Sequence, residues 1–253
     1  MVLENRQKNS VLDLTVDDLY CVKSLNYYRM IFDFEMLREK ADELFLKTHN
    51  LKTVENFCKS EYEKTKVNPK LLDSEISKRF YNCTFESYKP KTDILKKAKQ
   101  SAMSYAQNII TNLKEGKNLV LAGYDSTGTG KTHLAVAIAK ECFKKSVSVK
   151  FINSSKMMNQ IRQDFKTQRY LNCQLLIIDD ITKINVTDWC AEQIYYILNE
   201  RYSNMMPTII TCEEDIEYLK NYFADNGKAV ISRFFQNAVI VPVMGHDYRL
   251  VRN

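Results

Sequence analysis

A glycine-rich loop between an apolar run and an amphipathic run constrains the fold of this chain more than any other feature. Residues 118–122 read Asn-Leu-Val-Leu-Ala, a short run that suits a buried strand of a parallel sheet. The loop follows at 123–130, and from Lys131 onward apolar residues recur at helical spacing. The order of strand, glycine-rich loop and helix predicts an α/β fold with a site for phosphate groups at the loop.

The loop ends in the stretch Gly-Thr-Gly-Lys-Thr-His. Backbone N–H groups of such a turn close on phosphate oxygens, and the N-terminus of the following helix adds a partial positive charge. We expect Lys131 to reach the β- and γ-phosphates and the Thr132 hydroxyl to hold Mg²⁺. The predicted nucleotide-binding residues of the loop are Gly128, Thr129, Gly130, Lys131, Thr132 and His133.

One position of the loop departs from the phosphate-binding motif. In G-x-x-x-x-G-K-[ST] the first glycine falls on Asp125, and the nearest earlier glycine, Gly123, lies two residues upstream. Either the loop is two residues longer than usual, or Asp125 replaces the glycine with its carboxylate turned away from the phosphates. A loop that binds no nucleotide is the remaining alternative, and the sequence leaves the effect of Asp125 on activity open.

The composition excludes several classes of protein. The 253 residues are 45% hydrophobic and 27% charged, as in ordinary globular proteins. The sequence holds no apolar run near the roughly 20 residues that span a bilayer, and its N-terminus lacks the apolar core of a signal peptide. Seven cysteines without a C-x-x-C pair indicate free thiols rather than a disulfide or zinc framework. We therefore expect a cytoplasmic protein with no membrane partner.

The net charge of +6 is unevenly distributed. Residues 1–90 hold 15 basic and 15 acidic side chains, whereas residues 91–253 hold 22 and 16. The excess therefore lies entirely in the second part of the chain, together with the phosphate loop. A basic excess on a nucleotide-binding part gives weak support for a nucleic-acid partner, since most such excesses are solvated surface.

The first part of the chain reads as helical. From Thr15, which can cap a helix, apolar residues recur at steps of three or four through Phe45 and beyond. Neither a β pattern nor a glycine loop interrupts them, so we predict a small all-helical domain over residues 1–80. Its apolar stripe is either core or a face that docks a partner. Lys89-Pro90-Lys91 breaks the pattern, and residues 81–253 form the second predicted domain.

The rest of the chain alternates strands and helices. Thr92 is expected to cap one long helix over 93–115, ahead of the strand at 118–122. Further strands are expected at 147–152, 173–180, 208–212 and 238–243, with helices at 131–143, 154–165, 187–202, 214–223 and 227–235. This alternation predicts a parallel sheet with helices on both faces.

Two carboxylates end the strand predicted at 173–180. Ligands bind at the carboxyl ends of the strands in such sheets, so both side chains should lie near the phosphate loop. Phosphoryl transfer needs a carboxylate on the Mg²⁺ side and a second group that orients the attacking water. We assign the first task to Asp179 and the second to Asp180, with a simple turn-capping role as the alternative for Asp180.

Together, these motifs resemble the AAA+ ATPases of the DnaC/DnaI helicase-loader and IstB group over roughly residues 80–253. The matching stretches begin at Asn118, Gly128, Leu175, Thr208, Ile231 and Asp247. The resemblance implies a P-loop AAA+ core with a site completed by a neighbouring subunit. It places Thr211 near the first sensor position, Arg233 at the arginine finger and Arg249 at a late, second-sensor arginine. Because the sequence continues for only four residues after Arg249, we expect no C-terminal lid.

The sequence departs from the group at two positions. Glu213 stands where the group usually has an asparagine, and Asp180 stands where AAA+ proteins generally have a glutamate, which could weaken hydrolysis. The group contacts adenine near residues 85–91, so Phe85 or Tyr88 either packs on the base or belongs to the core. Residues 162–169 lie where initiator-like AAA+ proteins carry an extra helix that faces their central channel. The hypothesis is therefore that Lys150, Arg162, Lys166 and Arg169 contact a single-stranded backbone, and a solvated face is the alternative for them.

The resemblance implies a role in DNA replication. The leading hypothesis is an ATP-dependent loader of a replicative DNA helicase, with a helical domain that binds the helicase. Its core would bind ATP, Mg²⁺ and single-stranded DNA, and would form a homo-oligomer on ATP binding. The alternatives are an IstB-like transposition helper that acts on duplex DNA, and a catalytically weak adaptor.

Overall fold

The computed structural model describes residues 43, 44, 46–50, 52, 53, 56, 74–124, 127–184, 187–222 and 232–248. The chain divides into two compact units, Met1–Asp73 and Ser74–Asn253. In the first unit, residues 43, 44, 46–48, 52, 53 and 56 are helical. Most of the apolar stripe predicted there lies outside the described residues, so the helical domain over 1–80 stays a prediction.

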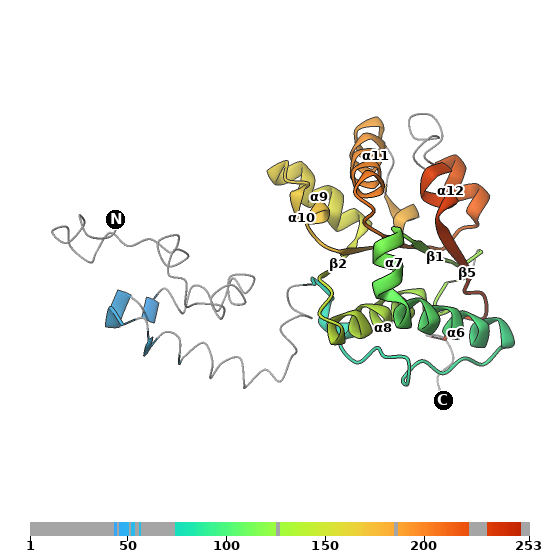
Figure 1. The fold of residues 1–253 in the computed structure, drawn as a ribbon, viewed down its shortest axis with the longest axis horizontal. Coiled ribbons are helices and arrows are strands. Elements are labelled where there is room, and N and C mark those ends of the chain that lie inside the picture. Colours follow the sequence, from blue (N-terminus) through green and yellow to red (C-terminus); the bar gives the residue numbers. More distant parts are fainter. Residues whose placement is uncertain are drawn as a thin grey trace. The chain divides into compact units, whose positions relative to one another are not determined.

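The second unit is built on a parallel sheet of five strands in the order β2-β3-β4-β1-β5 (Figure 1). The strands are β1 (Asn118–Ala122), β2 (Val149–Asn153), β3 (Leu175–Asp179), β4 (Thr208–Cys212) and β5 (Ala238–Pro242). Every residue of β1, β3 and β4 is buried, as expected for inner strands covered on both faces. The predicted α/β fold with a parallel sheet is confirmed.

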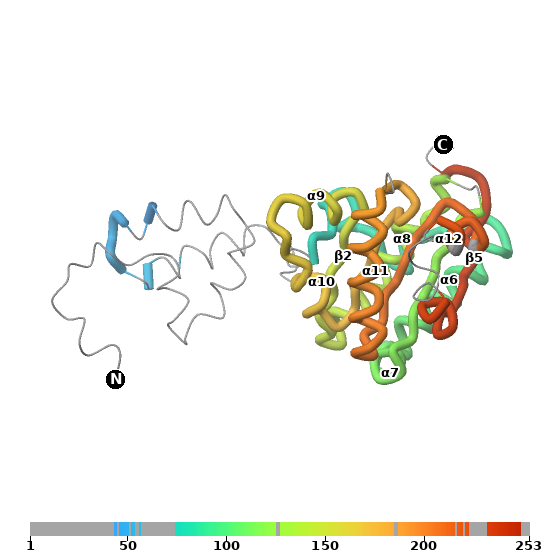
Figure 2. The backbone as a smooth tube through the Cα atoms, turned by 90° about the horizontal axis from the view of Figure 1, so that it is seen from above, coloured from blue at the N-terminus to red at the C-terminus, as the bar shows by residue number. Residues whose placement is uncertain are grey.

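Helices cover both faces of the sheet. The helices α6 (Asp93–Gln107) and α8 (Lys131–Lys144) lie on one face, with α7 (Ile109–Glu115) beside them (Figure 1). The other face carries α9 (Ser154–Asp164), α10 (Gln168–Leu171), α11 (Asp188–Ser203) and α12 (Ile216–Tyr222). Figure 2 shows α9 and α10 near the β2 edge and α12 near the β5 edge. Short 3₁₀ turns lie at η3 (Lys78–Phe80) and η4 (Ile181–Lys183), and residues 232–236 are helical.

The core between the sheet and the α9–α12 layer consists of buried apolar side chains. Side chains from alternate strand positions meet side chains of the covering helices, and most are fully buried; they include Val120, Leu176, Ile178, Ile210, Met157, Ile161, Ile194 and Ile197. Burial of this kind stabilises the unit by roughly 1.5–3 kcal/mol for each large aliphatic side chain. The sheet therefore holds the ends of its strands in fixed positions.

Among the described residues, no helix combines the length and the apolar character that crossing a bilayer requires.

The predicted helix over 93–115 is two helices. Thr92 caps the first through a hydrogen bond from Leu95 N–H, as expected. At Asn108 the backbone leaves the helical region, and the side-chain amide donates to the Ser104 carbonyl at 2.9 Å. Asparagine side chains compete in this way with helix hydrogen bonds, so the helix breaks there into α6 and α7.

The first residues of the second unit join the edge of the sheet. Ser74 is fully buried and its carbonyl accepts a hydrogen bond from Phe151 N–H of β2 at 2.7 Å. The Glu75 carboxylate forms ion pairs with Lys150 at 2.7 Å and with Lys156 at 2.8 Å. Residues 74–80 are therefore part of the compact second unit, seven residues ahead of the boundary drawn from the sequence.

Candidate nucleotide site

The phosphate loop has a backbone that only glycine fits at two positions. Gly128 and Gly130 have φ of +61° and +96°. A Cβ on Gly128 would lie 1.7 Å from an oxygen of the Asp247 carboxylate, and a Cβ on Gly130 would lie 2.5 Å from the Tyr88 ring. The two glycines thus permit both the left-handed backbone and the close approach of their neighbours.

Hydrogen bonds from distant segments fix the loop. The Tyr88 hydroxyl donates to the Thr129 carbonyl at 2.9 Å, and the Thr129 hydroxyl donates to the Val243 carbonyl at 2.8 Å. Tyr248 N–H donates to the Gly128 carbonyl at 3.2 Å. Because segments before the loop and after β5 both hold it, the loop is shaped by the folded unit rather than by its own sequence alone.

Lys131 lies at the first turn of α8 and is only 5% exposed. Burial lowers the pKa of Lys131, while the charges of Glu213 and then Asp180 raise it. The ammonium group therefore faces a carboxylate-rich wall inside the site. A phosphate group entering there would meet a cation that is already partly desolvated.

Thr132 and Asp179 lie side by side at the carboxyl ends of the strands. The Thr132 hydroxyl donates to the two Asp179 oxygens at 3.0 and 3.2 Å, and the Thr211 hydroxyl donates to Asp179 Oδ1 at 2.7 Å. Burial and then the neighbouring Asp180 raise the pKa of Asp179 to about 6, against the two hydroxyl hydrogen bonds. A hydroxyl and a carboxylate beside a phosphate loop form an oxygen donor set that fits Mg²⁺.

Asp180 follows β3 in a left-handed conformation with φ of 56°. Its N–H donates to the Thr211 hydroxyl at 2.9 Å, and its carbonyl accepts from the Ser154 hydroxyl at 2.6 Å. Its carboxylate lies 3.4 Å from the Lys183 ammonium, which also lies 3.1 Å from Glu213. The backbone of Asp180 is thus fixed while its carboxylate faces other charged groups.

These groups surround one pocket of about 450 Å³. Part of its wall was predicted from the sequence, and that part consists of Gly128, Thr129, Gly130, Lys131, Thr132, His133, Asp179 and Asp180. The remaining wall comes from residues that the sequence analysis did not select as contacts; they include Glu75, Ser77, Arg79, Phe80, Cys83, Asn153, Lys156 and Lys183. No motif marks the segment 75–83, because its place beside β2 depends on tertiary contacts.

The predicted contacts with adenine stay predictions. Phe85 and Tyr88 are both buried, and neither is part of the pocket wall. The side chains that reach the pocket from this part of the chain are Arg79, Phe80 and Cys83. Tyr88 contacts the phosphate loop: its hydroxyl donates to the Thr129 carbonyl, and its ring lies against Gly130.

Of the other predicted site residues, His133 is part of the pocket wall, whereas Thr211 and Arg233 are not part of the described wall. The His133 ring bonds the Thr84 carbonyl at 2.8 Å and the Ser87 hydroxyl at 3.1 Å, so it faces the 84–88 turn. Thr211 is fully buried behind Asp179. Arg233 is exposed, lies 6.0 Å from the centre of the Tyr202 ring and is absent from the described pocket wall. Asp125 and Arg249 lie outside the described residues.

A second surface, at the end of α9, carries an exposed aromatic ring. Phe165 is 78% exposed and has a left-handed backbone with φ of 53°. Nearby, Arg162 lies 5.1 Å from the centre of the Trp189 ring, and Arg169 forms an ion pair with Asp164. We call Arg162, Phe165, Lys166 and Arg169 the α9 platform. Lys150, which was grouped with these cations in the sequence, is only 17% exposed and is paired with Glu75.

Comparison with known proteins gives consistent similarities. The chain is 29% identical over 202 residues to the phage-like element PBSX protein XkdC of Bacillus subtilis (strain 168), covering 74% of each chain. It is 26% identical over 147 residues to the insertion sequence IS232 putative ATP-binding protein of Bacillus thuringiensis subsp. berliner, covering 54% of this chain and 58% of that protein.

Among solved structures, the DnaC helicase loader matches with a TM-score of 0.58 and 29% identity. That match covers 66% of this chain and 99% of the solved one. The sequence profile of the IstB-like ATP binding protein family matches residues 39–253, which include the phosphate loop, both aspartates and the whole sheet. The chain therefore belongs to the IstB-like ATP-binding protein family and is an AAA+ ATPase with the fold of DnaC.

Proposed function

We propose that this protein loads a replicative DNA helicase onto single-stranded DNA. The unit Met1–Asp73 would bind the helicase, and the unit Ser74–Asn253 would bind ATP and DNA. The similarity to the DnaC helicase loader, which spans nearly all of that solved chain, supports this assignment. The state of the nucleotide would decide whether the helicase is held or released.

The observation that carries the DNA part of the proposal is the exposed ring of Phe165. The Phe165 side chain is 78% exposed and has basic residues on both sides of it in the chain. Proteins that bind single-stranded nucleic acid stack bases on such rings and follow the backbone with cations. The α9 platform offers both, because Arg162, Lys166 and Arg169 lie within four residues of Phe165 in the chain.

The α9 platform separates the two DNA-binding hypotheses. Bases in a duplex are paired and stacked, so contacts with duplex phosphates need cations but no exposed ring. The similarity to an insertion-sequence ATP-binding protein favours the second candidate, a transposition helper on duplex DNA. An exposed phenylalanine among the cations favours unpaired bases and hence the loader.

The DNA part of the proposal is tested by Phe165→Ala. We expect affinity for a short single-stranded oligonucleotide to fall about tenfold, since one base–aromatic stack is worth roughly 1–3 kcal/mol. Fluorescence anisotropy at several salt concentrations measures this. Tyr218→Ala, which removes a 47% exposed aromatic ring on α12, is the control and should leave the affinity unchanged. Equal affinity of wild type for duplex and single strand, with no effect of Phe165→Ala, would favour the transposition helper.

The helicase part is tested by co-elution with the replicative helicase of the same cell, with and without ATP. The full chain and a chain that starts at Ser74 are compared, because the second unit has its own sheet and core. We expect a complex with the full chain alone, and we expect Lys131→Ala to remove its dependence on ATP. Binding of the helicase by the shorter chain would contradict the role given to the first unit.

For hydrolysis we propose that Mg²⁺ is held by Thr132 and Asp179, and that Arg233 acts on the site of a neighbouring copy. The second assignment is supported by the place of Arg233, outside the described wall of its own pocket. Lys131→Ala and Arg233→Ala chains should each be inactive alone. Mixing them should restore part of the turnover, because one kind of interface pairs an intact pocket with an intact arginine. Absence of rescue in co-assembled chains would exclude this role.

A further inference from the structure

The pocket holds a cation whose role the phosphate-loop motif does not explain. Among the described residues, three lysines line it, namely Lys131, Lys156 and Lys183. Lys131 belongs to the motif, and Lys156 is paired with Glu75 on the β2 side. Lys183 ends η4, the turn that follows Asp180, and its side chain is 48% exposed.

Two carboxylates from neighbouring strand ends hold the Lys183 ammonium group. Its Nζ lies 3.4 Å from Asp180 Oδ2, after β3, and 3.1 Å from Glu213 Oε1, after β4. Burial lowers the pKa of Lys183, but the hydrogen bond to Glu213 and the charge of Asp180 raise it more, so the net shift is upward. The ammonium group stays charged at neutral pH and is held at the pocket by partners that are themselves fixed to the sheet.

The same two carboxylates act on the phosphate-binding lysine. Glu213 and then Asp180 are the charges that most strongly favour protonated Lys131. Both carboxylates therefore lie near the place where Lys131 would meet a terminal phosphate. A phosphate beside two uncompensated carboxylates would be repelled by their negative charge. Lys183 is bonded to both and provides the compensating charge.

We propose that Lys183 contacts the γ-phosphate of bound ATP, and that Glu213 is a positioning residue that holds the Lys183 ammonium group in place. In hydrolysis the water oxygen bonds to the γ-phosphorus while the bond to the ADP oxygen breaks. The water proton passes to a carboxylate or to solvent. Lys183 gives up no proton and stabilises negative charge on the transferred phosphoryl group. The assignment concerns the ATPase site alone and does not depend on the partner under "Proposed function".

The test compares nucleotides that differ by the γ-phosphate. Calorimetry of the full chain with Mg²⁺ gives the affinities for ADP and for a non-hydrolysable ATP analogue. For Lys183→Met we expect affinity for the ATP analogue to fall about tenfold, the usual effect of losing one charge-assisted hydrogen bond, with ADP unchanged. Lys183→Arg should retain most of the preference for the ATP analogue.

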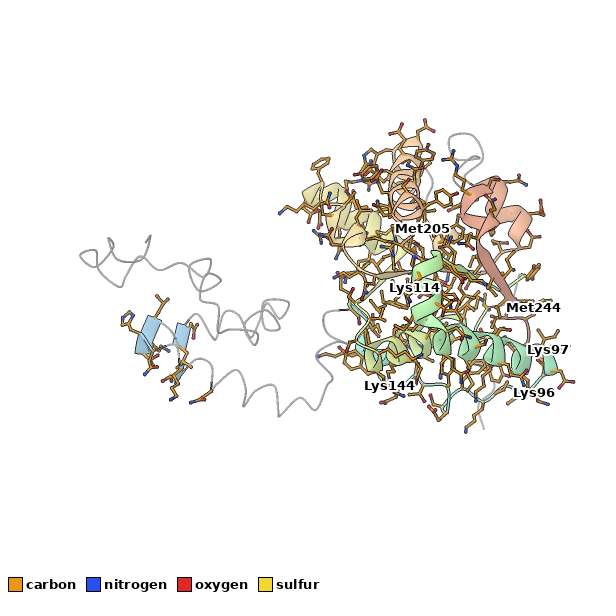
Figure 3. The ribbon with its side chains drawn as sticks, viewed as in Figure 1. Lys96, Lys97, Lys114, Lys144, Met205 and Met244 are labelled. Carbon is orange, nitrogen blue, oxygen red and sulfur yellow. The ribbon has the colours of Figure 1, made fainter. Side chains whose placement is uncertain are left out.

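Lys144→Met is the matched control. Lys144 also forms an ion pair with a carboxylate three residues away, Glu141 at 2.6 Å. It ends α8, on the opposite layer from α9–α12, and is not part of the pocket wall (Figure 3). The control should leave the affinities for both nucleotides unchanged.

The positioning role of Glu213 has its own test. Glu213→Gln keeps the size of the side chain and removes its charge, so the ATP preference should fall less than in Lys183→Met. The double variant should be no weaker than Lys183→Met alone, because Glu213 acts through Lys183. Additive losses, or tighter binding of the ATP analogue to Glu213→Gln, would overturn the positioning role.

Two results would overturn the assignment of Lys183. Equal loss of ADP and ATP-analogue affinity in Lys183→Met would show a general effect on the pocket. Unchanged affinities, with wild-type ATP binding intact, would show that Lys183 forms only a surface ion pair. A wild-type chain that binds no nucleotide would overturn this assignment and the ATP-dependent loader together, whereas failure to bind a helicase would leave the Lys183 result unaffected.

Discussion

Charged side chains at the two ends of the sheet have different surroundings: at one end they line a pocket, and at the other end an arginine is buried. At the carboxyl ends of the strands, charged side chains face one another across a pocket of about 450 Å³. At the amino ends, the Arg201 guanidinium is 1% exposed and is bonded to fixed oxygens of the protein. Those oxygens are the Thr208 hydroxyl and the carbonyls of Tyr170, Cys173, Gln174 and Pro207, at 2.7–3.2 Å.

The difference separates a structural charge from functional ones. Around Arg201 the donors are matched by dipoles that the chain connections ahead of β3 and β4 supply, so nothing is left for a ligand to bind. Lys183 is paired with two carboxylates, whose charges also act on Lys131, and a phosphate group could compete with those carboxylates for the two ammonium groups. A buried charge with a complete set of fixed partners indicates stability, and a set of charges facing a cavity indicates a site.

The largest effect is expected at the amino end. Arg201→Leu removes the guanidinium and leaves several buried carbonyl oxygens without donors, so we expect a loss of about 3–5 kcal/mol in the free energy of unfolding. Chemical denaturation of the full chain measures it. Arg169→Leu, which removes a partly exposed ion pair with Asp164, should cost far less. Similar losses in both variants would show that the buried hydrogen bonds of Arg201 contribute no more to the free energy of unfolding than an exposed ion pair does.

At the carboxyl end the expected effect is on rate. Asp180→Asn should lower kcat at least about 100-fold, the usual contribution of a positioned acid or base, while ATP binding is kept. Asparagine tolerates the left-handed backbone at this position, so the free energy of unfolding should change little. Steady-state ATPase assays and calorimetry give the two values. Loss of ATP binding together with hydrolysis would indicate a structural role for Asp180.

The smallest effect tests the support beneath the phosphate loop. Tyr88→Phe removes the hydrogen bond to the Thr129 carbonyl and should cost about 1 kcal/mol in unfolding and weaken ATP binding a few-fold. Tyr105→Phe is the control, because its buried hydroxyl donates to the Lys117 carbonyl far from the loop. It should lower stability without changing ATP affinity. Equal nucleotide effects in both variants would mean that the loop responds only to overall stability.

Much of the site could be predicted because its motifs are local. Strand, loop and helix around Lys131 are adjacent in the chain, and Asp179 ends a strand that parallel pairing must place near the loop. The ion pair between Lys183 and Glu213 at the pocket was not predicted, because its two residues are far apart in the sequence. Lys183 has no motif, and Glu213 was noted only as a departure from the expected asparagine. Their pairing follows from the strand order, which the sequence pattern does not specify.

One local expectation, the single helix over 93–115, was wrong. The apolar spacing over 93–115 is continuous, but the Asn108 side chain bonds the Ser104 carbonyl and breaks the helix. Thr211 was placed near the nucleotide by resemblance, whereas its hydroxyl is bonded to Asp179 behind the pocket, so its role as a sensor stays a prediction. Periodicity gives the face of a helix, and side-chain hydrogen bonds then decide where that helix ends.

The sequence by itself determined the parallel α/β fold, the phosphate loop and the two carboxylates after β3. These depend on short-range patterns of burial and backbone freedom, which glycine, β-branched and apolar residues impose directly. Only the tertiary structure decided that residues 75–83 line the pocket, that Arg201 is held by carbonyls and that Lys183 joins Asp180 to Glu213. Those arrangements depend on which strands become neighbours, and that choice is made by packing of the whole unit.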